Sequence, residues 1–165
     1  MDAAEVAEWE ALRKLRDVAN KALEGARNNK AIGASLEAKL HLHTDDATLK
    51  SALSKFSGGE GGSSNQVDDL RYILLTSGVA VSASADEAAA AGKLATETDE
   101  SLQLTVGLAP ADGTKCERCW NYETSVGGSS RYPGVCSRCE KALLAMDFPE
   151  VTLAQPPVEE AAAAA

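Results

Sequence analysis

The chain has 165 residues and a formal net charge of −9 at pH 7. Hydrophobic residues make up 44% and aromatic residues only 4%, so a globular core must be aliphatic and rich in alanine. This length allows one ordinary domain, or one domain with a metal-binding appendage. No apolar run approaches the roughly 20 residues of a membrane helix, and so acidic a chain is a poor general binder of polyanions.

The first third of the chain predicts a long helix and then a strand. Within residues 5–30, apolar side chains recur at steps of three or four and form one stripe: Trp9, Leu12, Leu15, Ala19, Ala22 and Ala26. Residues 36–43 alternate between apolar and polar side chains, which predicts a strand with one buried face. His41 and His43 fall on the polar face, where we expect solvent rather than a second metal site.

The middle of the chain predicts short elements. Thr44 or Asp45 is placed to cap a second helix, which carries Leu49, Leu53 and Phe56. Residues 57–64 are a Gly/Ser loop typical of a flexible connector. A third short helix and then a short strand follow, marked by Val67, Leu70 and Leu74 and by Val79 and Val81. Residues 83–100 are alanine-rich and acidic and fit helix, loop or both.

A second alternating strand covers residues 102–108, a short helix covers 141–148, and residues 150–165 are predicted to be a disordered tail. Together these elements predict an α+β fold. A long helix comes first, then a small sheet of two long strands and a third short one covered by short helices, and last a metal ribbon.

The four cysteines of the chain form two C-x-x-C knuckles, Cys116 with Cys119 and Cys136 with Cys139, separated by sixteen residues. Four thiolates at this spacing can surround one Zn²⁺ as a tetrahedron, which leaves no open position for catalysis. The sequence therefore predicts one structural zinc ion. The alternatives are two disulfides or free thiols. Two disulfides would require a secreted chain, and a redox motif would have only one C-x-x-C pair, so this pattern favours zinc.

The region around the knuckles is the least acidic part of the chain. Residues 112–141 carry five bases and four acids, whereas residues 44–100 carry four bases and ten acids. If any face meets nucleic acid, we expect it in this region. The candidate contact residues are Lys115, Arg118, Trp120, Arg131, Arg138 and Lys141. For Trp120 the alternative is a hydrophobic lid over the metal, and for Arg118 and Arg138 it is the neutralisation of thiolate charge.

Residues 112–122 (DGTKCERCWNY) and 135–139 (VCSRC) resemble the C-terminal zinc finger of bacterial and organellar isoleucyl-tRNA synthetases, a finger type shared with formamidopyrimidine-DNA glycosylases. Residues 15–24, 26–27 and 32–38 resemble the same synthetases just before their finger. The glycosylases use an N-terminal proline amine as nucleophile, whereas this chain begins Met1-Asp2. The resemblance thus favours the synthetases and covers about residues 9–43 and 101–145.

This resemblance implies a domain plan. Residues 1–35 would hold the last helix of the anticodon-binding helical domain, 36–110 a small α+β junction domain, and 111–149 the zinc-finger ribbon. The implied function is that of a non-catalytic tRNA-interaction module, which positions the anticodon arm of isoleucine tRNA within an isoleucine–tRNA ligase. The partners would be that tRNA and the catalytic core of the synthetase, in cis or in trans, with no membrane.

The sequence departs from a complete synthetase. The His-x-Gly-His and Lys-Met-Ser-Lys-Ser loops that hold ATP in this family do not occur in the sequence, so ATP would bind only in a core outside this chain. We expect the C-terminal part of a larger enzyme, whether a fragment, a split gene product or an incomplete gene model. Zinc-bound thiols indicate a reducing compartment, which is the cytoplasm, a plastid or a mitochondrion. The alternative function is a structural zinc ribbon that contacts a synthetase core and binds no RNA.

Overall fold

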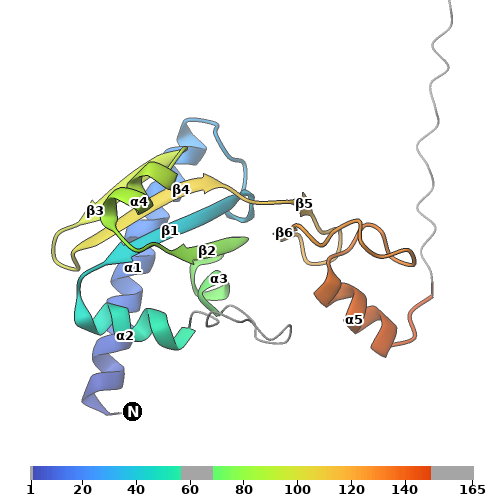
Figure 1. The fold of residues 1–165 in the computed structure, drawn as a ribbon, viewed down its shortest axis with the longest axis horizontal. Helices are drawn as coiled ribbons and strands as arrows, with labels where there is room; N and C mark the ends of the chain where they lie inside the picture. The colour runs from blue at the N-terminus through green and yellow to red at the C-terminus, as the bar shows by residue number, and fades with distance from the viewer. Residues whose placement is uncertain (1, 57–68, 150–165) are drawn as a thin grey trace, which may run out of the picture.

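The computed structural model describes residues 2–56 and 69–149, which form a larger body and a smaller lobe at the C-terminal side (Figure 1). The body contains helices and a mixed sheet, and the four cysteines lie in the lobe, so the predicted α+β class is confirmed. The Gly/Ser loop predicted at 57–64 and the tail predicted at 150–165 lie outside the described residues.

The first element is the helix α1, Ala3–Asn28, close to the predicted span of 5–30. A capping box begins it, because the Asp2 carboxylate accepts from the Glu5 amide at 2.8 Å and the Glu5 carboxylate accepts from the Asp2 amide at 2.9 Å. The buried stripe of α1 consists of Ala11, Leu12, Leu15, Ala19, Ala22, Leu23 and Ala26. Trp9, placed on this stripe by the sequence, remains 43% exposed.

The sheet has four strands: Ala38–Thr44 (β1), Gly78–Val81 (β2), Ala95–Asp99 (β3) and Leu104–Pro110 (β4). Their order is β2-β1-β4-β3, with β1 and β2 parallel and the other pairs antiparallel. A short 3₁₀ helix, Ser35–Glu37, precedes β1. The two long strands and the short third one match the prediction, whereas β3 is a strand within the acidic segment whose composition fits helix or loop.

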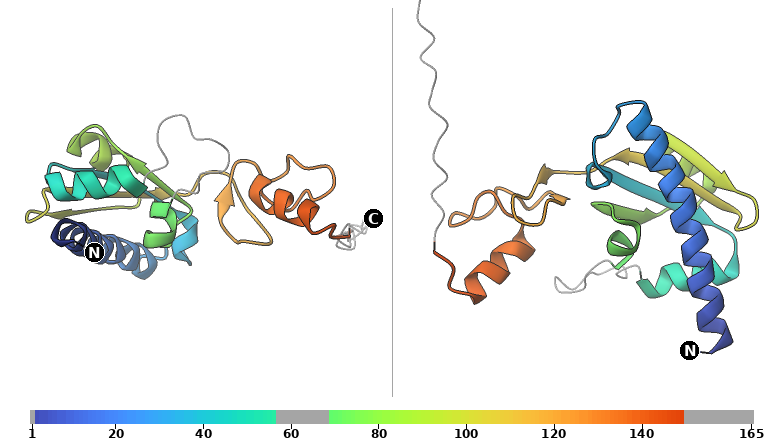
Figure 2. Two further views of the ribbon diagram at one scale, coloured as in Figure 1. Left: turned by 90° about the horizontal axis from the view of Figure 1, so that it is seen from below. Right: turned by 180° about the vertical axis from the view of Figure 1, so that it is seen from behind.

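Helices cover both faces of the sheet. In Figure 2, α1 crosses one face and the short helix α4, Ala85–Ala91, lies on the other. The approach of α4 to β4 depends on Gly107, since a Cβ there would stand 2.0 Å from the carbonyl oxygen of Ala88. This second layer corrects the expectation for the histidines of β1. The face of His41 and His43 is only partly open, and the side chain of His43 is 13% exposed.

The helices α2, Ala47–Phe56, and α3, Asp69–Leu74, pack against α1. The predicted cap of α2 is wrong by one residue, because Asp46 accepts from the Leu49 amide at 2.7 Å. Thr44 instead donates to the Leu102 carbonyl at 2.6 Å and is buried. The core between α1, α2, α3 and the sheet is almost wholly aliphatic: Leu12, Leu15, Leu23, Leu40, Leu42, Leu49, Leu53, Leu70, Leu74, Leu104, Val106 and Leu108.

Candidate metal centre

Both knuckles are shaped by backbone hydrogen bonds. A hairpin of Thr114–Lys115 (β5) and Tyr122–Glu123 (β6) encloses the first knuckle, where the Trp120 amide donates to the Cys116 carbonyl at 2.8 Å. The helix α5, Ser137–Ala145, starts at the second knuckle with Cys136 as its N-cap residue. This helix begins earlier than the predicted 141–148, because the knuckle itself forms its first turn.

The four sulfur atoms converge on one point. All of them lie within 4.8 Å of one another, and the Sγ atoms of Cys119 and Cys136 are 3.8 Å apart. Zn–S bonds of about 2.3 Å in a tetrahedron place the sulfurs about 3.8 Å apart, so the donor set fits zinc. The same separation is far beyond a disulfide bond, and all four cysteines are free.

The protein partly neutralises the sulfur cluster. The Cys136 amide donates to the Cys116 sulfur at 3.3 Å, and Nη1 of Arg118 lies 3.6 Å from the Cys139 sulfur. Cys116, Cys136 and Cys139 are buried, while Cys119 is half-buried. Donors aimed at the sulfurs favour the thiolate forms that a zinc ion requires.

Without a metal, the thiols of Cys119, Cys136 and Cys139 differ in acidity. Burial raises the pKa of Cys119, but hydrogen bonds from the side chain and backbone of Asn121 outweigh it and bring the pKa to about 6. Burial raises the pKa of Cys139 to about 12, although Arg118 opposes the shift, and burial also raises the pKa of Cys136. A buried group of four thiolates therefore needs a cation, and Zn²⁺ supplies the charge that this donor set demands.

Trp120 does not cover the cluster, so the lid interpretation is wrong. Its side chain is 62% exposed, and its backbone adopts the left-handed conformation with φ of 65°. This conformation is unfavourable for a bulky residue, and the knuckle imposes it on Trp120. The Lys115 ammonium stands 5.9 Å from the centre of the Trp120 ring, within the range of a cation–π contact.

The other candidate bases are placed differently. Arg138 donates to the Tyr72 hydroxyl and lies over the Tyr72 ring at 5.7 Å. Arg131 donates to the Phe148 carbonyl at 3.1 Å and lies 5.3 Å from the ring centre of Tyr132. Lys141 is exposed on α5. The candidates thus have different neighbours: Lys115 stands beside Trp120, Arg118 beside Cys139, Arg138 beside Tyr72 and Arg131 beside Phe148.

The lobe is held against the body by contacts that the sequence did not indicate. Nη1 of Arg71, from α3, donates to the Glu123 carboxylate at 2.6 Å and to the Ser77 carbonyl at 3.1 Å. The Tyr122 amide donates to the Ser77 hydroxyl at 2.8 Å, and that hydroxyl donates to the Leu36 carbonyl. We call Arg71, Ser77, Tyr122 and Glu123 the clasp. No spacing or motif links these four residues, so only the fold reveals them.

Two comparisons with known proteins bear on this site. Residues 113–142 match a family model described as "Zinc finger found in FPG and IleRS". The chain is 45% identical over 138 residues to an isoleucine–tRNA ligase of Rippkaea orientalis, covering 84% of this chain and 14% of that protein. It is 44% identical over 135 residues to the isoleucine–tRNA ligase of a Nostoc strain, covering 82% and 13%. A third such ligase, from Thermosynechococcus vestitus, is 42% identical over 142 residues, covering 86% and 14%.

The predicted resemblance to isoleucyl-tRNA synthetases, another name for these ligases, is therefore confirmed, and the sulfur cluster with the finger family supports one structural zinc ion. The chain spans only about 14% of the length of the relatives that it matches. Among residues 2–56 and 69–149, no helix has both the length and the apolar character needed to cross a bilayer.

Proposed function

We propose, from the premise that this chain is homologous to the C-terminal region of isoleucine–tRNA ligases, that it is a non-catalytic module which positions the anticodon arm of isoleucine tRNA. In this proposal, formation of the adenylate and charging of the tRNA take place on a catalytic core outside this chain, which is the second partner. The residues of this chain bind and orient RNA.

The observation that carries the proposal is the exposed Trp120 on a lobe fixed by the metal. A side chain that is 62% exposed beside the Lys115 ammonium offers an aromatic face and a positive charge together. Unpaired bases of an RNA loop stack on such faces, and phosphates pair with such charges. Since the knuckle determines the backbone of Trp120, the metal fixes the direction in which the ring projects.

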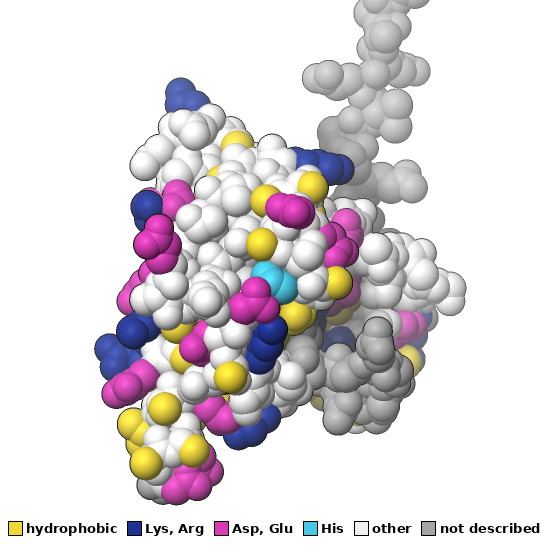
Figure 3. Space-filling view, turned by 60° about the vertical axis from the view of Figure 1, so that its left-hand side comes forward, with side chains coloured by type: hydrophobic (Ala, Val, Ile, Leu, Met, Phe, Trp, Pro, Cys, Tyr) yellow, Lys and Arg dark blue, Asp and Glu magenta, His cyan; other side chains and the backbone are white. Residues whose placement is uncertain are grey.

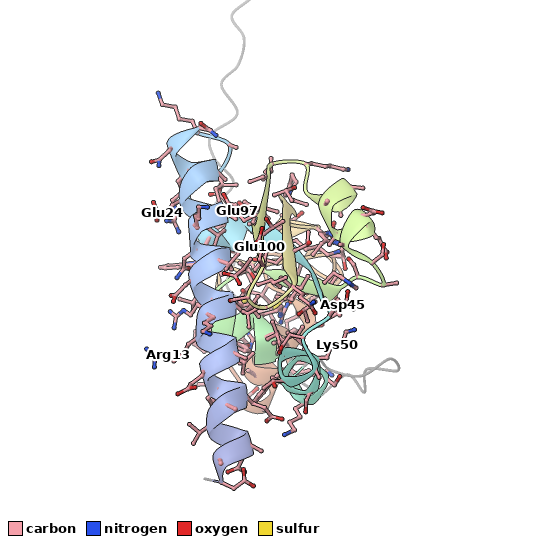
Figure 4. All side chains as sticks on the ribbon, turned by 90° about the vertical axis from the view of Figure 1, so that its left-hand side faces the viewer. Arg13, Glu24, Asp45, Lys50, Glu97 and Glu100 are labelled. Atoms are coloured by element: carbon pink, nitrogen blue, oxygen red, sulfur yellow. The ribbon has the colours of Figure 1, made fainter. Side chains whose placement is uncertain are left out.

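The charge distribution directs RNA toward the lobe. Figure 3 shows basic and acidic side chains interspersed on one side of the body, with no broad basic area. Figure 4 labels Glu24, Glu97 and Glu100 near α1 and β3, where Glu24 is paired with Arg27 and Glu97 with Lys21, so the bases in these pairs already hold acids. On the lobe, Lys115 and Lys141 are exposed. Three arginines already donate to groups of the protein and would offer RNA only their remaining donors: Arg118, Arg131 and Arg138.

Fluorescence anisotropy with labelled isoleucine tRNA and the zinc-loaded chain tests the proposal. We expect saturable binding that weakens as salt rises. Trp120→Ala should weaken this binding by about 1–3 kcal/mol if a base stacks on the ring. Trp9→Ala is the matched control, since it removes the other tryptophan, which lies on α1 and is 43% exposed. Absence of saturable, salt-sensitive binding would reject RNA contact by this chain.

A second candidate function is protein contact without RNA, and an apolar area at the start of α1 favours it. Val6 and Trp9 are 39% and 43% exposed, and the Trp9 ring lies 5.3 Å from that of Phe56. A synthetase core could cover this area. If Trp9→Ala reduced binding to an isoleucine–tRNA ligase lacking this region, and Trp120→Ala changed no RNA binding, the protein-contact function would replace the first proposal.

A further inference from the structure

A hollow on the α4 side of the sheet gathers three nitrogen-bearing side chains. Its volume is about 410 Å³, and Lys39, His41, Lys93 and Asp112 supply all its charged and titratable groups. Lys39 and His41 share one face of β1, and Lys93 follows α4. The rest of the lining is alanine and proline, so these four groups determine what the hollow can bind.

Asp112 is the anion that these nitrogens already face. Its carboxylate accepts from the Lys39 ammonium at 2.6 Å. Lys39 is the main cause that lowers the pKa of Asp112, and His41 and Lys93 lower it further through their charges. The Asp112 side chain is 64% exposed, whereas that of Lys39 is 28% exposed. An exposed carboxylate held by one ion pair can be exchanged for another anion at little cost.

Lys93 and His41 have donors to spare. Within residues 2–56 and 69–149, neither side chain makes a hydrogen bond or an ion pair. Glu87 is the other acid that acts on His41, and its carboxylate accepts from the Ala83 amide at 2.8 Å. The hollow therefore offers an ammonium and an imidazole without partners, together with a second ammonium that Asp112 holds.

Two other hollows of the body, within the residues that the structure describes, lack this property. In the one lined by His43, Asp45 and Lys50, the lysine is paired with the aspartate at 2.7 Å. In the one beside the clasp, Arg71 is paired with Glu123 and Lys39 with Asp112. The hollow beside the clasp shares Lys39 and Asp112 with the hollow on the α4 side, and Tyr122 of the lobe lines it. Since the two hollows share residues and one of them reaches the lobe, the unpaired donors of Lys93 and His41 lie close to the lobe.

We propose that Lys39, His41 and Lys93 form a phosphate-binding subsite for the backbone of RNA, and that Asp112 occupies this subsite when no RNA is bound. Lysine ammonium groups bind phosphate as point charges, and the imidazole adds a directed donor. This inference rests on the proposed function, because it extends the path of an RNA strand from Trp120 on the lobe to the body.

The first test uses inorganic phosphate and the zinc-loaded full chain. The imidazole signals of His41 and His43 are followed by NMR at pH 7 while phosphate replaces chloride at constant ionic strength. We expect saturable shifts at His41 and none at His43, whose Nδ1 lies 3.2 Å from the Ser82 carbonyl. Asp112→Asn should tighten the binding of phosphate severalfold, because it removes the competing carboxylate and frees Lys39.

The second test uses isoleucine tRNA over a series of salt concentrations. Lys93→Ala should weaken binding and reduce the salt slope by about 0.7 for one lost phosphate contact of a single strand, which is roughly a 2.6-fold change in relative affinity between 50 and 200 mM salt. Asp112→Asn should strengthen binding. Lys50→Ala is the matched control, since it removes an exposed lysine that is already paired with Asp45 and lines a different hollow.

The two tests separate the subsite from the proposed function. If phosphate leaves His41 unmoved, and Lys93→Ala behaves like Lys50→Ala toward tRNA, the subsite is rejected even where Trp120→Ala weakens RNA binding. If phosphate moves His41 and Asp112→Asn tightens its binding while tRNA fails to bind, the subsite stands for phosphate and the proposed function fails.

Discussion

Glu123→Ala should release the lobe from the body without unfolding either. The ion pair between Arg71 and Glu123 is 2.6 Å long, and its side chains are 17% and 29% exposed. Removing one partner of a fully buried pair costs about 3–5 kcal/mol, whereas an exposed pair contributes about 0–1 kcal/mol. Arg71 would keep its bond to the Ser77 carbonyl, so we expect about 2 kcal/mol for this half-buried pair.

Hydrogen exchange at the Tyr122 amide measures this loss, because that amide donates to the Ser77 hydroxyl across the clasp. A cost of about 2 kcal/mol corresponds to exchange that is faster by roughly thirtyfold, after correction for the intrinsic rate of the new sequence. The Leu40 amide, in the strand at the centre of the body, should keep its rate.

A double-mutant cycle with Arg71→Ala isolates the pair. In the Arg71→Ala background, Glu123→Ala should have almost no further effect on exchange at Tyr122. Asp45→Ala, which breaks the exposed pair with Lys50, should leave that exchange unchanged. An unaltered rate at Tyr122 in Glu123→Ala would show that the ion pair does not hold the lobe.

Three further predictions concern the metal, the packing of α4 and pH. Cys119→Ala or chelation should make residues 112–145 sensitive to protease while the helical circular dichroism of the body persists; resistance unchanged by chelation would contradict a structural zinc. Gly107→Ala should lower the free energy of unfolding by about 1–3 kcal/mol, since its Cβ would meet the Ala88 carbonyl; urea titration measures this, and an unchanged midpoint would refute it. Burial, with help from Lys39, lowers the folded-state pKa of His41, so the unfolded chain takes up its proton first. Stability should therefore fall as pH drops below about 6.5, and His41→Gln should reduce that fall in urea titrations at pH 7.5 and 5.5; an equal fall in the variant would refute it.

Strong periodicity made part of the fold predictable. The alternation in residues 36–43 predicted β1, and the apolar stripe of residues 5–30 predicted α1. Strand β3, Ala95–Asp99, has no such pattern, because it lies at the edge of the sheet and its side chains are at most half-buried. Lys21 of α1 pairs with Glu97 of β3 at 2.7 Å, a long-range contact that no local signal announces.

The site was predictable where covalent spacing determines it. Two C-x-x-C knuckles require their sulfurs to meet if a metal is to be held, and the sulfurs do meet. The exposure of Trp120 depends on a left-handed backbone, and the positions of Arg118 and Arg138 depend on which acceptors the fold brings near. The clasp joins residues up to 52 positions apart, so its partners are known only once the chain has folded.

The hydroxyl group of Ser77 links the body to the lobe, so the two parts cannot change independently at this contact. Ser77 donates to Leu36 in the body and accepts from Tyr122 in the lobe, so a substitution there alters both at once. Transplanting the lobe from a relative onto this body would preserve its four cysteines and still misplace it, unless Arg71 on α3 and Ser77, between α3 and β2, also matched that lobe. A substitution on one side of the clasp is therefore tolerated only if it suits the residues on the other side. We expect the lobe and the body to change together during evolution.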